Sequence, residues 1–138
     1  MSDDGAGLVV AQAVHKHLVD FDLELSSAGG LEVVDRILAY RTAAIVDSMV
    51  TGDHPPGTAV GFELGKARTL RTLGSHGIGL AEAIGTARSW GAPVAGRILV
   101  FGVEVVDPFK VGSEISKQVL DRVEAAALEI AEAIKREG

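Results

Sequence analysis

The segment that most constrains the fold is a nearly continuous apolar stretch at residues 42–50, TAAIVDSMV, which contains one charge, Asp47. Such a run is typical of a β-strand covered on both faces, because both of its alternating side-chain rows must then be apolar. A second run of this kind covers residues 97–105. Two such strands in one chain predict a sheet with helices packed on both sides.

The remaining elements follow from spacing. Apolar residues three and four apart predict helices at residues 7–19, 31–38 and 75–90. A long helix begins at a capping Ser113 and continues almost to residue 138. Its expected apolar stripe consists of Ile115, Val119, Val123, Ala127, Ile130 and Ile134. Apolar and polar residues alternate at residues 21–25 and 58–63, which predicts two more strands, the second at an edge of the sheet. The expected architecture is one α/β domain spanning residues 1–138, a three-layer sandwich with a mostly parallel, twisted sheet.

Two connections carry polar residues. Residues 51–57, TGDHPPG, contain two prolines and two glycines and predict a turn that includes His54. Residues 64–75 form an irregular basic segment with Lys66, Arg68 and Arg71. This segment is either a solvated loop or a surface that recognises a partner.

Composition excludes several classes of function. Nineteen acids against thirteen bases give a net charge of −6, which disfavours nucleic acid and anionic membranes as partners. The chain has no cysteine, so it cannot contain a disulfide, a zinc-thiolate site or a thiol nucleophile. The sequence shows neither a secretory leader nor a run of ~20 apolar residues, and we expect a cytoplasmic protein that does not enter membranes.

Candidate site residues are expected at the carboxyl ends of strands, where open α/β sheets bind their ligands. Asp47 lies at the end of the most apolar strand, His76 lies at a helix start, and Asp4 belongs to an acidic pair that precedes the first helix. Taken alone, each residue has a structural explanation: Asp47 as a cap of the following loop, His76 as an exposed loop histidine, and Asp4 as an acid at a helix N-terminus. Together, two carboxylates and an imidazole on one edge would suit a divalent ion such as nickel, zinc or manganese.

Other signatures of catalysis are absent from the sequence. It contains no His-Glu-x-x-His pair, no Gly-x-Ser-x-Gly elbow and no complete dinucleotide-binding loop. His15 and His17 are two residues apart on one predicted helix and therefore point to different faces. Asp4, Asp47 and His76 therefore remain as the candidate group.

Five motifs follow one another along the chain: SDDGAG at 2–7, AIVDS at 44–48, PGT at 56–58, SHGIGL at 75–80 and VFGVE at 100–104. In order and spacing they resemble the motifs of the [NiFe]-hydrogenase maturation endopeptidases. The resemblance implies a cytoplasmic, aspartyl-type endopeptidase that removes a C-terminal extension from the nickel-loaded large-subunit precursor of a hydrogenase. It also implies that Asp4, Asp47 and His76 contact nickel that the substrate supplies, with no organic cofactor, and a monomer is the expected state.

The sequence departs from the family in two places. The family's opening strand and its Gly-Asn-x-Leu turn have no counterpart before Asp4, which predicts a natural start upstream of Met1. The family's Asp-Gly-Gly-Thr region corresponds here to SSAGG at residues 26–30. Two other functions stay open: a metal-reading assembly partner of hydrogenase that does not cleave, and a related α/β hydrolase with another substrate.

Overall fold

The computed structural model describes residues 5–24, 30–38, 40–62, 80–106 and 117–137. Within these ranges lie four helices and three strands. In chain order they are α1 (Ala6–His15), α2 (Gly30–Arg36), β1 (Thr42–Met49), β2 (Ala59–Phe62), α4 (Leu80–Ser89), β3 (Arg97–Glu104) and α6 (Lys117–Glu137).

The sheet has the strand order β1-β3-β2, so the two apolar runs of the sequence lie side by side. β1 and β3 pair in parallel from Thr42 opposite Arg97 to Met49 opposite Glu104. β2 pairs with β3 in the antiparallel direction and forms one edge, as predicted for residues 58–63. In this register Asp47 lies opposite Gly102, near the carboxyl ends of both parallel strands.

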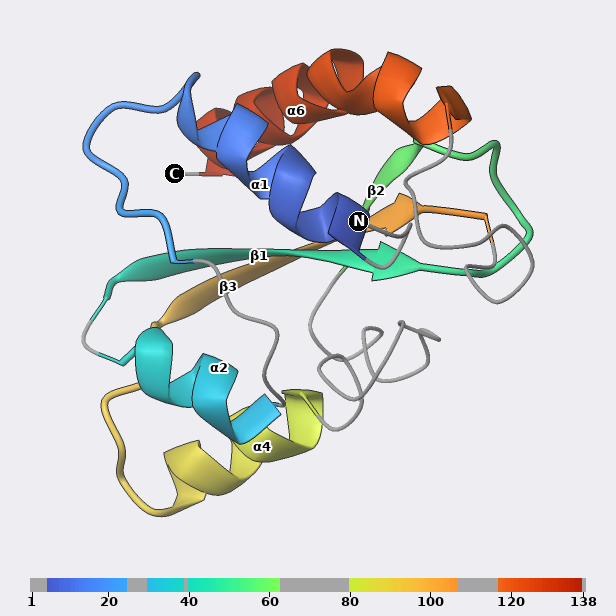
Figure 1. Cartoon of the computed structure of the whole chain (residues 1–138). Helices are drawn as coiled ribbons and strands as arrows, with labels where there is room; N and C mark the ends of the chain where they lie inside the picture. The colour runs from blue at the N-terminus through green and yellow to red at the C-terminus, as the bar shows by residue number, and fades with distance from the viewer. Residues whose placement is uncertain (1–4, 25–29, 39, 63–79, 107–116, 138) are drawn as a thin grey trace.

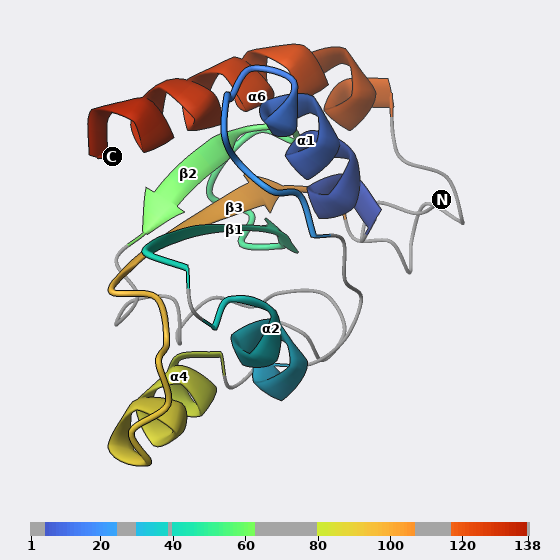
Figure 2. The same ribbon diagram turned by 90° about the vertical axis from the view of Figure 1, so that its left-hand side faces the viewer.

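Helices cover both faces of the sheet, which confirms the predicted α/β architecture. Figures 1 and 2 show α1 and α6 on one face, and α2 and α4 on the other. The larger core joins α1 and α6 to the sheet and includes Val10, Phe101, Ile130 and Ile134. A smaller core beneath the sheet contains Val34 and Ile84.

The apolar stripe predicted for the long C-terminal helix faces the core in the described part of α6. Of the expected apolar stripe, Val119, Ala127, Ile130 and Ile134 are buried and Val123 packs against the core. Ser113 and Ile115 lie outside the described residues. No helix in the described ranges is long and apolar enough to cross a membrane.

The predicted strand at residues 21–25 is wrong for the part that is described. Residues 21–24 form no strand, and in the described sheet β1 pairs with β3 alone. Alternating apolar residues become a strand only when a neighbouring strand accepts their backbone hydrogen bonds, and within the described residues no strand pairs with 21–24. The first helix also ends at His15, earlier than the predicted residue 19.

We expect Ile130→Ala to lower the free energy of unfolding by about 2–5 kcal/mol, because it removes a buried side chain between α6 and the sheet. Leu128→Ala on the same helix should cost less than about 1 kcal/mol, because Leu128 is exposed. Urea unfolding of both variants checks this pair. Equal losses would contradict the observed orientation of α6.

Candidate functional site

Asp47 lies on β1 two residues before the strand ends, and its side chain is half-buried. Its Oδ1 accepts a hydrogen bond from the backbone N–H of Ser48, with an N to O distance of 2.8 Å. The carboxylate therefore has a local backbone donor, as the structural explanation of Asp47 expects. It also lines a cavity along β1, so this local bond leaves it within reach of a ligand.

The start of α1 is held directly against Asp47 and Ser48. The backbone N–H of Gly7 donates to the buried Oγ of Ser48 at 3.1 Å. A β-carbon at position 7 would lie 3.1 Å from the α-carbon of Asp47 and 3.2 Å from the backbone N of Ser48. A side chain would press against backbone here, and glycine permits the close approach.

This contact brings the first described residues to the carboxyl half of β1. Asp4 precedes Gly7 by three residues, but Asp4 and His76 both lie outside the described residues. Whether they join Asp47 around one ion therefore stays a prediction. Among the described residues alone, no group of three His, Asp or Glu side chains is placed to hold a metal ion.

Glu104 is a second acid at the same edge of the sheet, and the sequence analysis did not single it out as a site residue. It is the last residue of β3 and is 2% exposed. Its carboxylate accepts the backbone N–H groups of Thr51 at 2.8 Å and Gly52 at 3.1 Å, together with the Thr51 hydroxyl. The sequence contained a signal for Glu104, because it is an acid at the end of an apolar run. The same signal singled out Asp47.

Glu104 fixes the turn that follows β1. Besides its side-chain contacts, its backbone carbonyl accepts the N–H of Gly57 and its N–H donates to the carbonyl of Thr58. The predicted Pro-Gly turn is thereby folded onto the end of β3. Glu104 thus explains the geometry of the loop beside Asp47, which is a structural role.

His15 and His17 contact different partners, in agreement with the prediction that their side chains point to different faces. His15 Nε2 lies 2.8 Å from the carbonyl oxygen of Phe21, and since a carbonyl only accepts, this nitrogen carries the proton. His17 lies 3.4 Å from a carboxylate oxygen of Glu124 on α6. The two rings have different partners, so they do not form a shared metal site.

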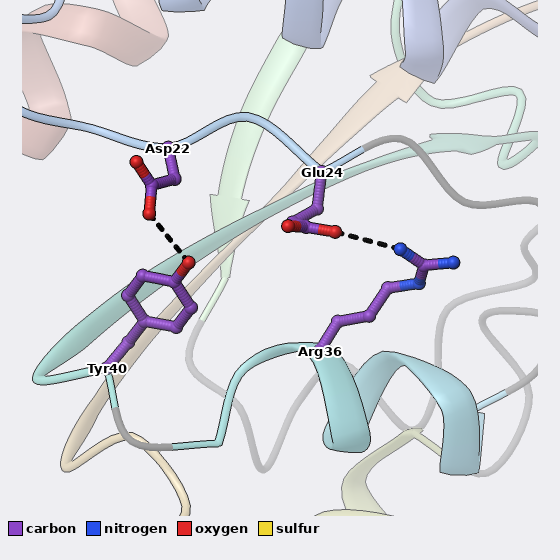
Figure 3. Close-up of polar contacts among 4 residues, drawn as sticks. All are labelled: Asp22, Glu24, Arg36 and Tyr40. Atoms are coloured by element: carbon purple, nitrogen blue, oxygen red, sulfur yellow. Dashed lines mark hydrogen bonds and ion pairs between the residues drawn. The ribbon is translucent and has the colours of Figure 1, made fainter.

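A cavity of about 430 Å³ runs along β1 from Thr42 to Asp47. Residues of α1, α2, β3, α6 and the segment 20–24 also line it. Two polar contacts hold the segment 20–24 on the side of α2, as Figure 3 shows. Tyr40 donates its hydroxyl to Asp22 at 2.7 Å, and Arg36 pairs with Glu24 at 2.8 Å.

The fold defined by these elements is that of the hydrogenase maturation endopeptidases. The hydrogenase maturating endopeptidase HybD from Escherichia coli superposes with a TM-score of 0.73 at 21% identity, over 100% of this chain and 87% of that one. An endopeptidase from Escherichia coli gives 0.75 at 19% identity, over 99% and 86%. The [NiFe]-hydrogenase maturation protease HybD from Thermococcus kodakarensis gives 0.69 at 21%, over 97% and 90%.

These similarities establish the fold. Neither the protein-family models nor the curated proteins gave a match to this chain.

Gly7→Ala should destabilise the protein by about 1–3 kcal/mol, because the new methyl group meets the backbone of Asp47 and Ser48. Gly85→Ala in α4 is the control, since a β-carbon there meets nothing within 4 Å and alanine favours a helix. Thermal unfolding should show opposite effects of the two changes. A neutral Gly7→Ala would contradict the close approach of α1 to β1.

Tyr40 is the one tyrosine of the sequence, so its titration can be followed alone. The hydrogen bond to Asp22 and the charge of that carboxylate raise the pKa of Tyr40 above 10.0. This interaction of Tyr40 stabilises the folded protein fully below the pKa that Tyr40 has in the unfolded chain. The stabilisation is lost as the pH rises through the raised pKa of Tyr40 in the folded protein. In Asp22→Asn the pKa should fall towards 10.0, whereas Asp35→Asn on α2 should leave it unchanged; absorbance of tyrosinate measures both.

Proposed function

We propose that this chain is a hydrogenase maturation endopeptidase that removes a C-terminal extension from the nickel-loaded large-subunit precursor of a [NiFe]-hydrogenase. The observation that carries the proposal is the position of Asp47. It lies near the carboxyl end of a parallel strand and lines a cavity, in a fold shared with endopeptidases of hydrogenase maturation. Ligands of open α/β sheets bind at this edge.

The proposed site consists of Asp47 with Asp4 and His76, and its metal is nickel carried by the precursor. Carboxylate and imidazole groups are suitable ligands for such a divalent ion. The contact of Gly7 with Ser48 supports Asp4 as a member, because it brings α1 to the strand that bears Asp47. In this proposal the three side chains read the metal state of the substrate, and water activated at the metal is the natural attacking group.

The proposed function includes a protein partner, a compartment and an oligomeric state. The precursor is the protein partner, the cytoplasm is the compartment, and the endopeptidase acts as a monomer without an organic cofactor. The net charge of −6 fits a protein partner better than a polyanion.

The decisive experiment incubates the chain with nickel-loaded and nickel-free precursor and follows the precursor mass. We expect cleavage of the nickel-loaded form only, and at least a ~100-fold loss of rate in Asp47→Asn, which keeps the shape of the side chain. Asp53→Asn is the matched control, because Asp53 is exposed in the turn after β1. Asp4→Asn and His76→Ala should lose activity as Asp47→Asn does.

Each other result has a defined meaning. Precursor binding without a change of mass would identify an assembly partner that does not cleave. No interaction with the precursor would point to an α/β hydrolase with a different substrate. Wild-type cleavage by Asp47→Asn would remove Asp47 from the site.

A further inference from the structure

Glu104 and Asp47 lie on the same face of the sheet, on neighbouring strands. Val46 of β1 and Phe101 of β3 pack in the core with α1 and α6. Because side chains alternate along a strand, Asp47 and Glu104 both point to the opposite face. Glu104 pairs with Met49, two residues beyond Asp47. The two acids are therefore diagonal neighbours at the carboxyl edge of the sheet.

The side chain of Met49 separates these two acids. Met49 is 0% exposed, and a β-carbon at Gly102 would lie 2.5 Å from its Sδ atom. Since Gly102 is the pairing partner of Asp47, the Met49 side chain crosses the diagonal between the acids. The hydrogen bonds of the Glu104 carboxylate go instead to the turn that follows β1. Any influence of Glu104 on the site beside Asp47 therefore passes through this turn.

The turn at residues 51–57 is held at both ends. At its start, Thr51 and Gly52 donate to the Glu104 carboxylate. At its end, the N–H of Gly57 donates to the carbonyl oxygen of Glu104 at 2.7 Å. A β-carbon at Gly57 would lie 2.5 Å from the β-carbon of Arg122, so the turn also packs closely on α6. Figure 1 shows this connection between β1 and β2 beyond the arrowhead of β1.

The Glu104 carboxylate and the turn depend on each other. Burial of an ionised carboxylate is unfavourable unless hydrogen bonds replace its water, and Glu104 is 2% exposed. Within the described part of the chain, the turn supplies these donors. Without the carboxylate, the N–H groups of Thr51 and Gly52 would lose their acceptor. Removal of this one side chain should therefore release the start of the turn.

The middle of the turn presents a fixed surface at the edge where ligands of open α/β sheets bind. Asp53 and Pro55 are exposed there. Pro55 and Pro56 restrict the backbone, and Thr58 donates its hydroxyl to the carbonyl of Pro55 at 2.7 Å. A surface that is ordered before binding loses less conformational entropy when a partner docks. The turn thus has the properties of a preformed wall beside Asp47.

We propose that Glu104 is a positioning residue for binding of the precursor, because it holds the turn at residues 51–57 as one wall of the precursor-binding site. The identity of the partner rests on the proposed function. Glu104 touches neither the precursor nor its metal. The turn makes the contact, and the shape of its backbone determines how well the precursor fits.

The test measures the Kd of the nickel-loaded precursor for the wild type and for Glu104→Ala. The Kd should rise roughly fivefold or more in the variant, because the released turn must be ordered again on binding. Amide exchange at Thr51 and Gly52 should become roughly tenfold faster, whereas Val105, which donates to the carbonyl of Met49, should not change. In the cleavage assay KM should rise while kcat stays within about twofold.

Glu104→Gln is the matched control for the geometry of the turn. The amide oxygen of glutamine can accept both backbone N–H groups, and its nitrogen can donate to the hydroxyl oxygen of Thr51. Exchange, Kd and KM should therefore stay within about twofold of the wild type. Asp53→Asn removes a charge from the turn but keeps its backbone, so it should leave the Kd unchanged.

Two further comparisons separate positioning from stability. Ile130→Ala removes a buried side chain from α6 and should lower stability without changing the Kd. If Glu104→Ala does not fold, Thr51→Val removes the hydroxyl that binds Glu104 and should raise the Kd roughly twofold or more. Thr51→Ser keeps the hydroxyl and should bind as the wild type does.

Three results would overturn the role of Glu104. An unchanged Kd in folded Glu104→Ala, despite faster exchange, would remove the turn from the binding site. An equal rise of Kd in Ile130→Ala would reduce the effect to lost stability. An equal rise in Glu104→Gln would assign it to the charge of the carboxylate.

The outcomes also separate this role from the proposed function. If the wild type binds the precursor without cleaving it, the proposed endopeptidase activity is wrong, and the Kd values still decide the role of Glu104. If the wild type does not bind the precursor, both proposals are wrong. If the wild type cleaves and Glu104→Ala has an unchanged Kd and KM, only the role of Glu104 is wrong.

Discussion

The close approach of α1 to β1 at Gly7 is the constraint on which the rest of the site depends. With no side chain at position 7, the helix starts directly on the backbone of Asp47 and Ser48, where the Ser48 hydroxyl receives its N–H. From this point α1 runs back over the sheet and packs with α6 around Val10, Ile130 and Ile134. This contact thus fixes where the helical layer of α1 and α6 meets the carboxyl half of β1.

The two acids at the carboxyl edge of the sheet have different environments. Glu104 is buried and receives the donors of Thr51 and Gly52, so its carboxylate organises a loop. Asp47 accepts the backbone N–H of the adjacent Ser48 and lies on a cavity. Two acids near the carboxyl ends of neighbouring strands therefore have different roles: one is structural and the other, in our proposal, reads the metal.

Residue patterns predicted most of the described fold, and the failures have a physical cause. The apolar runs at residues 42–50 and 97–105 form β1 and β3, and the apolar stripe of α6 is buried. These features could be predicted because the spacing of apolar residues within a segment depends on whether it is buried on two faces or along one stripe. Residues 21–24 have the alternation of a strand but bind His15, Tyr40 and Arg36 instead. Strand pairing needs a neighbour, which spacing within a segment does not specify.

The sequence by itself determined the α/β class, the apolar strands, the absence of thiol chemistry and Asp47 as a charge that needed an explanation. Tertiary structure alone decided that Gly7 meets Asp47, that Glu104 holds the following turn, and that a cavity lies along β1. The reason is the distance along the chain. Hydrophobic spacing acts over a few residues, whereas the bond of Gly7 to Ser48 joins residues 41 positions apart and the bond of Thr51 to Glu104 joins residues 53 positions apart.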